Sequence, residues 1–236
     1  MAKGLNLPTK ASDSPQVWFA KVGDEPALLE HQVIEQLSSS ERVRLESIKS
    51  INKRQEYLLS RALMRHALSE RFALETQAWK FVEETNSAPI IQNLPEGHWL
   101  SLSHSHGFIC FALANQPIGI DIELAKARTN FLALAKAFMS DDELELMNSK
   151  DHSDADTFYK IWCAKEAFYK MLTPDEQAGL FLKKINYFDL VKGHHCLLAN
   201  GKIDDCYLAL VTKESPGEPI QLKAHTFNGS VPISWY

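Results

Sequence analysis

Two runs near the middle of the chain constrain its fold more than any other feature. Phe108–Ala114 (FICFALA) is continuously apolar and has the length of a buried strand. Asn115–Pro117 carries a turn signal, and Ile118–Glu123 (IGIDIE) then alternates apolar residues with Gly, Asp and Glu. Such alternation is typical of a strand, because successive side chains of a strand point to opposite faces. The chain therefore has β-structure at its centre.

The segments around this centre predict both helices and strands. Helices are predicted at Pro26–Leu37, from Ser39 or Ser40 to about Ser69, at Phe131–Phe138, after a Ser140 cap and at Thr157–Leu172. Further strands are predicted at Gln16–Val22, Trp79–Glu83, Pro89–Gln92, Trp99–Ser103, Ile185–Leu190, His195–Leu198, Cys206–Val211 and Gln221–Thr226. The polar segment Ser103–Gly107 is predicted to be a turn. This mixture indicates the α+β fold class.

The composition argues against several classes of protein. The chain has 236 residues, of which 45% are hydrophobic and 23% charged, enough for one large domain or two small ones. A formal net charge of −5 argues against nucleic-acid binding. No run approaches the roughly 18 apolar residues of a membrane span, and the first residues lack the apolar core of a signal peptide. The four cysteines show no C-x-x-C spacing, so we expect a cytoplasmic protein with free thiols that binds no membrane.

The alternating strand places two carboxylates side by side. Asp121 and Glu123 are two residues apart and share one face, whereas Ile120 and Ile122 point the other way, into a core. Adjacent carboxylates repel one another unless a cation lies between them. A divalent cation with oxygen ligands is the natural partner, and magnesium is usual where phosphate is also present. Two acids on a solvent-exposed strand edge are the simpler explanation of a D-x-E pattern taken alone.

Two further motifs are each ambiguous in isolation. On the predicted helix, Glu166 and Lys170 are four residues apart and share a face with Trp162. The three residues could form a functional cluster, or Glu166 and Lys170 could be an ordinary surface ion pair beside a core tryptophan. In Ser103-His104-Ser105, the histidine could donate to a phosphate, although a turn of small polar residues explains the triplet equally. Basic residues gather at Lys49, Lys53, Arg54, Arg61, Arg65 and Arg71. Such a local cluster in an acidic chain suits a small polyanion or a solvated helix face.

Taken in order, these motifs resemble those of the Sfp-type 4′-phosphopantetheinyl transferases. That family shows a serine-histidine-serine turn, a G-I-D-I-E strand and a W-x-x-K-E-A/S-x-x-K helix, which correspond here to Ser103–Ser105, Gly119–Glu123 and Trp162–Lys170. The resemblance spans roughly Arg54 to Phe188. It implies transfer of the 4′-phosphopantetheine arm of coenzyme A to a serine of an acyl or peptidyl carrier protein, with release of 3′,5′-ADP.

The resemblance also implies roles for individual residues. Asp121, Glu123 and Glu166 would hold Mg²⁺ on the pyrophosphate of coenzyme A. Glu166, or a metal-bound water, would be the base, and Lys170 would stabilise charge on the transferring group. Binding of the phosphates of coenzyme A is assigned to Ser103, His104, Arg54, Arg61 and Lys170.

The sequence departs from the family at two places. Ser87-Ala88-Pro89 lacks the phosphate-binding lysine that relatives carry before the serine-histidine turn, and Thr173–Leu180 is longer and more acidic than the corresponding segment. The implied fold is two similar α/β halves in one chain with pseudo-twofold symmetry. We place the halves at residues 1–116 and 117–236 and expect a monomer with the site between them.

Three alternatives to transfer remain open at this stage. A hydrolase of coenzyme A or nucleotide pyrophosphates would also need magnesium and acids, but the chain has no R-E-x-x-E-E motif. A non-catalytic coenzyme A-binding module would be marked by loss of a metal ligand, yet Asp121, Glu123 and Glu166 are all present. A purely structural protein would carry the three motifs by coincidence. The sequence does not indicate which carrier protein is served.

Overall fold

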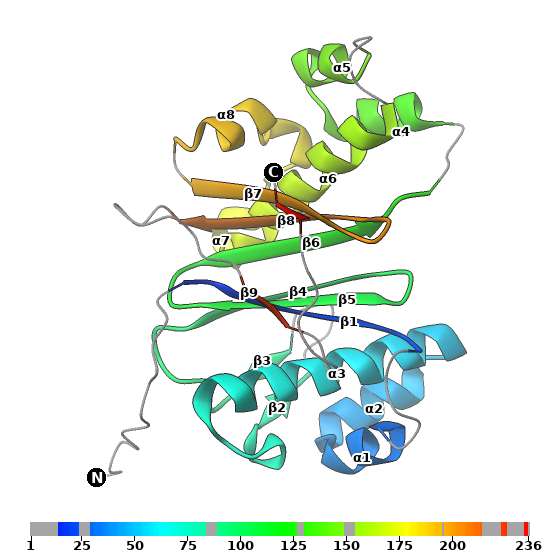
Figure 1. Ribbon diagram of the computed structural model, residues 1–236, viewed down its shortest axis with the longest axis vertical. Helices are drawn as coiled ribbons and strands as arrows, with labels where there is room; N and C mark the ends of the chain where they lie inside the picture. The colour runs from blue at the N-terminus through cyan, green and yellow to red at the C-terminus, as the bar shows by residue number, and fades with distance from the viewer. Residues whose placement is uncertain are drawn as a thin grey trace.

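The structure is a computed structural model and describes residues 14–23, 29–83, 89–126, 130–148, 154–194, 196–213, 223–225 and 234–235. Its helices and strands stack in four layers, a helical layer on each outer side and two sheets between them (Figure 1). This confirms the α+β fold class. The parts of the sequence predictions that fall on residues 26–28, 87–88, 195, 221–222 and 226 lie outside the described ranges.

The first sheet belongs mainly to the N-terminal half of the chain. Its order is β4-β5-β1-β9, with β1 Gln16–Lys21, β4 Trp99–Ser105, β5 Phe108–Ala114 and β9 Lys223–His225. The pairings are antiparallel except for β9, which runs parallel to β1 and comes from the end of the chain. The helix α3 (Ile51–Phe72) packs on the outer face of this sheet, because it presents Leu63, Met64 and Leu68 to β1 and β5.

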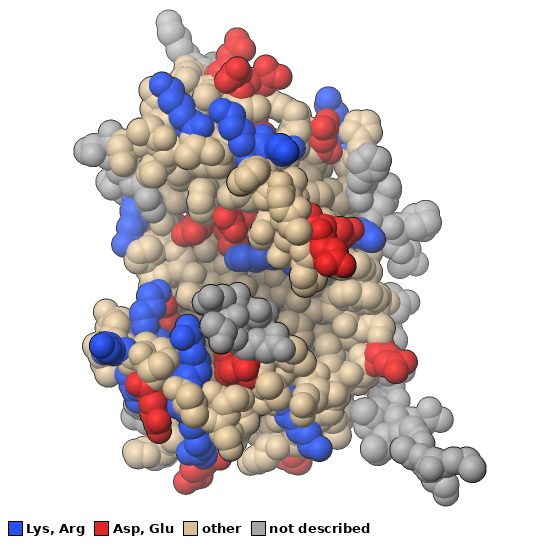
Figure 2. All heavy atoms as spheres, turned by 180° about the vertical axis from the view of Figure 1, so that it is seen from behind, with Lys and Arg blue, Asp and Glu red and all other residues tan. Residues whose placement is uncertain are grey.

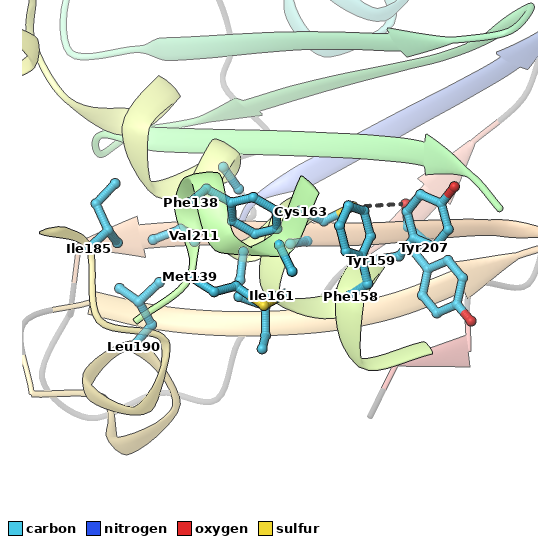
Figure 3. Close-up of a cluster of buried hydrophobic side chains, with 14 of the residues drawn as sticks. Phe138, Met139, Phe158, Tyr159, Ile161, Cys163, Ile185, Leu190, Tyr207 and Val211 are labelled. Atoms are coloured by element: carbon cyan, nitrogen blue, oxygen red, sulfur yellow. Dashed lines mark hydrogen bonds between the residues drawn. The ribbon is translucent and has the colours of Figure 1, made fainter. Parts of the chain in front are cut away.

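The second sheet belongs to the C-terminal half. Its order is β10-β7-β8-β6, with β6 Ile118–Leu124, β7 Cys196–Ile203, β8 Cys206–Lys213 and β10 Ser234–Trp235. The long helix α6 (Asp154–Met171) covers its outer face. Aromatic side chains of α4 and α6 pack here with residues of β8, including Tyr207 and Val211, in a continuous apolar cluster (Figure 3). All four cysteines are buried free thiols.

The inner faces of the two sheets form a third core. Ile120 and Ile122 of β6 are fully buried there, against Val17 of β1 and Cys110 of β5. The prediction that these isoleucines point into a core is therefore confirmed. The chain passes from the first sheet to the second at Asn115–Pro117, between β5 and β6.

The remaining described elements complete the helical layers and a small hairpin. These are α1 Leu29–Gln36, α2 Ser39–Ser47, η1 Thr76–Ala78, β2 Phe81–Val82, β3 Ile90–Ile91, α4 Phe131–Phe138, α5 Asp141–Met147, α7 Pro174–Gln177, η2 Leu182–Lys184 and α8 Tyr187–Lys192. No helix in these ranges is long and apolar enough to cross a membrane.

The structure corrects three local predictions. The single helix expected from Ser39 or Ser40 to Ser69 is two helices, because the chain turns extended at Ile48 and Ser50 between α2 and α3. The strand predicted at Ile185–Leu190 is instead the residue after η2, the N-cap Asn186 and the first part of α8. The reason is local, since the side chain of Asn186 caps this helix by accepting hydrogen bonds from the first backbone N–H groups.

The third correction concerns the Ser-His-Ser triplet. It was predicted to be a turn, but β4 continues to Ser105, and the turn consists of His106 and Gly107. Both turn residues have positive φ, 50° for His106 and 87° for Gly107, as a two-residue hairpin loop between twisted strands requires. In a strand, His104 points to the face opposite that of Ser103 and Ser105.

Two buried ion pairs fasten the outer helices to the rest of the protein. Arg65 of α3 binds Glu41 of α2 at 2.7 Å, and both side chains are almost fully buried. Lys165 of α6 binds Glu143 of α5 at 2.6 Å and also donates to the Phe138 carbonyl at 2.8 Å. Lys165 therefore has a structural role, although it directly precedes Glu166 in the sequence.

The predicted Ser140 cap is confirmed and supports a stability prediction. Ser140 Oγ accepts from the Glu143 backbone N–H at 3.4 Å, while the Glu143 carboxylate accepts from the Ser140 N–H at 2.7 Å. Ser140→Ala removes only the first bond, so we expect a loss of about 1 kcal/mol in the free energy of unfolding, measured by urea titration. Thr173→Ala, at the equivalent cap of the four-residue α7, should lose less because that short helix packs less against the core.

Candidate active site

The predicted acidic strand and the predicted Trp-Glu-Lys helix lie against each other. Asp121 and Glu123 of β6 point away from the isoleucine core and toward α6. Gly119 allows the close approach, because a Cβ at this position would lie 1.8 Å from the Ala167 carbonyl oxygen in α6. The glycine of the G-I-D-I-E motif is therefore a packing requirement that brings the helix onto the strand.

Hydrogen bonds join the two acids to α6 and to β4. Lys170 Nζ lies 2.6 Å from Asp121 Oδ1, which also accepts from Ser103 Oγ at 2.8 Å. Trp162 Nε1 donates to Glu123 Oε1 at 3.2 Å. The predicted helix face of Trp162 and Lys170 therefore meets the predicted strand face of Asp121 and Glu123.

Glu166 lies between Trp162 and Lys170 on this face, and its acid-base behaviour reflects the crowding of negative charge. Burial raises the pKa of Glu166, and the nearby charges of Asp121 and Glu123 raise it further. Burial likewise raises the pKa of Glu123, with a contribution from Asp121. Burial alone would lower the pKa of Lys170, but the adjacent Asp121 outweighs this effect and raises it. The ammonium group therefore stays charged and partly neutralises the acids.

The donor atoms of this group suit a cation. Asp121 is 3% exposed, and its Oδ2 is buried and accepts no hydrogen bond from a nitrogen or oxygen donor among the described residues, with the weakly donating Cys163 thiol beside the carboxylate. An unpaired buried carboxylate oxygen is costly, and a divalent cation is the ligand that would satisfy it. In the described part of the chain, however, no three Asp, Glu, His or Cys side chains converge into a complete metal site. The ion pair with Lys170 accounts for part of the neutralisation of Asp121 in this arrangement.

His104 lies on the opposite face of β4, toward α3. It is half exposed, and its Nδ1 lies 3.5 Å from Glu56 Oε2. Burial lowers the pKa of His104, although Glu56 opposes the effect. The positive charges of Lys53, Lys170 and Arg61 also lower it. The imidazole therefore has Glu56 as its nearest charged partner and three cations further away, and such cations would favour binding of a phosphate near His104.

The two arginines predicted to bind phosphate are placed differently from each other. Arg61 is 5% exposed and is held by Glu83 and Glu41, with its guanidinium over the ring of Tyr57. Arg54 donates from Nη1 to the Leu45 carbonyl at 2.6 Å. Arg61 is close enough to affect His104 electrostatically.

Figure 2 shows how charged side chains are distributed over one face of the molecule. Acidic side chains and a basic one gather where the upper, C-terminal half meets the lower half, and further Lys and Arg side chains lie over the lower half. Acidic and basic side chains are thus mixed over both halves of this face.

Sequence reasoning missed two residues that shape this site. Ser105 Oγ donates to Glu123 Oε2 at 2.7 Å, and its place in the Ser-His-Ser triplet was the available signal. Glu56 accepts from the Gly107 N–H at 2.7 Å and so ties the β4–β5 turn to α3. Glu56 has a local ion-pair partner in Lys53, but the partners that tie it to the site, Gly107 and His104, are about 50 residues away in the sequence, so no local pattern marks this role.

Comparison with known proteins connects this geometry to a family. Residues 117–221 match the 4′-phosphopantetheinyl transferase superfamily. The chain is 36% identical over 114 residues to 4′-phosphopantetheinyl transferase Sfp of Bacillus subtilis (48% of this chain, 50% of the relative). It is 35% identical over 124 residues to 4′-phosphopantetheinyl transferase psf-1 of Bacillus pumilus (52% of each). These two matches therefore span about half of the relatives' length.

A third match extends much further along both proteins. The chain is 30% identical over 180 residues to a 4′-phosphopantetheinyl transferase of Bacillus subtilis, which covers 71% of this chain and 79% of the relative. Identity at this level over most of both chains accompanies the three motifs and the packing of the acidic strand on the Trp-Glu-Lys helix. The chain therefore belongs to the 4′-phosphopantetheinyl transferase superfamily.

Proposed function

We propose that the protein transfers the 4′-phosphopantetheine arm of coenzyme A to a serine of an acyl or peptidyl carrier protein, with Mg²⁺ held by Asp121, Glu123 and Glu166. The observation that carries this proposal is the buried Oδ2 of Asp121, which accepts no hydrogen bond from a nitrogen or oxygen donor among the described residues and lies near two further acids of raised pKa. When bound, the ion would neutralise charge on the pyrophosphate. The named family of the relatives supports the choice of reaction.

Each residue of the site has a defined task in this reaction. The carrier serine oxygen forms a bond to the β-phosphorus, the bond from that phosphorus to the bridging oxygen breaks, and 3′,5′-ADP leaves. Glu166 would accept the serine proton, and its raised pKa brings it closer to neutral pH, where a general base is most effective. Lys170 remains protonated and would lie beside the developing negative charge.

The phosphates of coenzyme A would occupy the basic side of the site near His104. A neutral imidazole still has one N–H to donate, and the neighbouring cations attract the anion. Arg61 and Arg54 are also proposed to bind phosphate. Arg61 would first have to exchange its ion pair with Glu83 for one with the phosphate. The Ser103 hydroxyl is already hydrogen-bonded to Asp121, Lys170 and the Ile122 backbone N–H. Ser103 would therefore act on coenzyme A through Asp121 and not by direct contact with a phosphate.

His104→Ala is expected to raise the KM for coenzyme A about tenfold while changing kcat by less than about twofold. The reason is that a phosphate contact far from the reacting phosphorus contributes to binding in the ground state and the transition state alike. Steady-state kinetics with varied coenzyme A measures both constants. His66→Ala, a half-exposed histidine of α3 outside this site, is the matched control and should leave KM unchanged. A normal KM in the His104 variant would contradict the phosphate assignment.

The reaction itself is tested by the intact mass of a panel of apo carrier proteins after incubation with the protein, coenzyme A and Mg²⁺. A gain equal to phosphopantetheine on any carrier, suppressed by chelator, is the expected result. Release of 3′,5′-ADP and phosphopantetheine without carrier modification would instead indicate a pyrophosphate hydrolase. Binding of coenzyme A without either product would indicate a non-catalytic module.

The proposal also concerns the oligomeric state of the active protein. The acids and the Ser-His-Ser triplet come from the two predicted halves, 117–236 and 1–116, so one chain carries all of the proposed site residues. We therefore propose a monomer that acts in the cytoplasm. Sedimentation of the active protein at assay concentration tests the monomer.

A further inference from the structure

Two edge strands from different sheets run next to each other at the site. β4 is the last strand of the first sheet and β6 the last strand of the second, and the two pack side by side. Edge strands normally present unpaired backbone N–H and C=O groups. In β6 the N–H groups that do not point to β8 therefore need other acceptors, because each strand of an antiparallel pair directs alternate N–H groups away from its partner.

Three serines of β4 provide those acceptors. The backbone N–H groups of Ile120, Ile122 and Leu124 donate to the hydroxyl oxygens of Ser101, Ser103 and Ser105 at 3.0, 3.2 and 3.3 Å respectively. The sequence separation is 19 at every step, so the two strands run parallel in register. All three serines are 4–6% exposed, so water is not the alternative partner.

Two of these hydroxyls also hold the acids. Ser103 donates its single proton to Asp121 Oδ1 at 2.8 Å, and Ser105 donates its proton to Glu123 Oε2 at 2.7 Å. Ser103 further accepts from Lys170 Nζ at 3.0 Å, which uses the full capacity of one donor and two acceptor positions. Ser101 has no acid to serve, because the residue at the equivalent position of β6 is Gly119.

We propose that Ser101, Ser103 and Ser105 form a hydroxyl ladder that joins the two sheets in place of backbone hydrogen bonds, and that Ser103 and Ser105 thereby fix the orientation of the Asp121 and Glu123 carboxylates. The serines are positioning residues. His104, between them in the sequence, is the member of the triplet whose side chain faces away from the ladder. The ladder rests on geometry alone, and only its effect on cation binding rests on the proposed function.

The ladder is tested first in the metal-free protein by amide hydrogen exchange, followed residue by residue by NMR. Ser103→Ala should speed exchange of the Ile122 amide about tenfold, and Ser101→Ala should do the same to Ile120, each with little change at the other rung. Val33→Ala, a core substitution in α1 far from β6, controls for general destabilisation. Equal acceleration at all amides in every variant, or none, would overturn the ladder.

The positioning role is tested by Mn²⁺ titration without coenzyme A, with Mn²⁺ as a paramagnetic substitute for Mg²⁺. Ser103→Ala and Ser105→Ala should weaken Mn²⁺ binding about 10–100-fold, as loss of a hydrogen bond to a ligating group does. Ser101→Ala breaks a rung that contacts no carboxylate and should leave the affinity unchanged. Ser105→Thr retains the hydroxyl and should restore binding toward the wild-type value.

These outcomes separate the ladder from the proposed function. If the three alanine variants bind Mn²⁺ with the same affinity as one another, the serines make structural contacts only and the positioning role is overturned. Wild-type protein that binds no Mn²⁺ would overturn the magnesium assignment and the positioning role with it, while amide exchange still decides the ladder. Carrier modification is measured separately, so its absence alone would contradict only the transferase proposal.

Discussion

Asp121→Asn is expected to reduce phosphopantetheine transfer at least about 10³-fold while the protein remains folded. Asparagine preserves the shape of the side chain, and its carbonyl oxygen can still accept from Ser103 and Lys170. The substitution removes the negative charge and replaces one carboxylate oxygen with an NH2 group. The oxygen replaced is the buried Oδ2, which has no nitrogen or oxygen donor as partner among the described residues. Lys170 keeps Glu166 as a neighbouring negative charge, so the loss of one acid does not isolate the ammonium group.

The measurement is the initial rate of holo-carrier formation, paired with the midpoint of thermal unfolding with and without Mg²⁺. Mg²⁺ should raise the midpoint of the wild type, because an ion that binds only the folded state stabilises it. Asp121→Asn should lack this shift.

Burial and mutual repulsion raise the pKa values of Glu123 and Glu166. Folding without a cation is therefore penalised as the pH rises through those values.

Asp156→Asn is the matched control for this variant. Asp156 also accepts hydrogen bonds from cationic side chains, including Lys202 at 2.9 Å. Burial by itself would raise the pKa of Asp156, but these hydrogen-bond partners outweigh burial and lower it to about 2. Its removal should affect stability and leave both transfer and the Mg²⁺ shift intact. Wild-type transfer by Asp121→Asn would refute the proposed metal site, even if the protein proves to be a transferase.

Gly119→Ala is expected to lower the free energy of unfolding by more than about 3 kcal/mol or to prevent folding. The added methyl group would lie 1.8 Å from the Ala167 carbonyl oxygen and 2.7 Å from the Met171 backbone nitrogen. These are backbone atoms of α6, so no side-chain rotation relieves the contact and the helix itself must move. Because α6 carries Glu166 and Lys170, any folded variant should also lose transfer activity.

Urea unfolding of the variant measures the stability change, and the carrier assay measures the activity that survives. Gly97→Ala is a useful control, because a Cβ there meets no atom within 4 Å and only the positive φ of 75° is unfavourable. It should cost about 1–2 kcal/mol and spare activity. A Gly119→Ala protein with normal stability and full transfer would show that the close packing of α6 on β6 is not required.

Local periodicity was sufficient to predict the most important faces of the site. The alternation in Ile118–Glu123 predicts that Asp121 and Glu123 share a face, and it depends only on the geometry of one strand. The spacing of Trp162 and Lys170 likewise predicts one helix face. Both predictions are confirmed because each concerns neighbours within a single element.

Predictions that depended on partners far along the chain were less complete. Arg61 and Arg65 share a helix face as their spacing indicates, but Glu41 and Glu83 are their partners only because α2 and β2 pack there. Helical spacing and the family resemblance single out Lys170 over Lys165, but neither gives the partner of either lysine. Lys165 is buried against Glu143, whereas Lys170 reaches Asp121, and the position of α5 decides this.

The sequence by itself determined the α+β class, the pairing of Asp121 with Glu123 on one face and the family resemblance, because these follow from residue order and short-range periodicity. Only the tertiary structure decided that β4 and β6 meet as edge strands of separate sheets. Alternation along β4 puts His104 on one face and the two serines on the other, and the contact with β6 places Ser103 and Ser105 on the acids while His104 lies toward α3. The physical reason is that hydrogen bonds between residues 18 or 19 positions apart exist only once both sheets have packed.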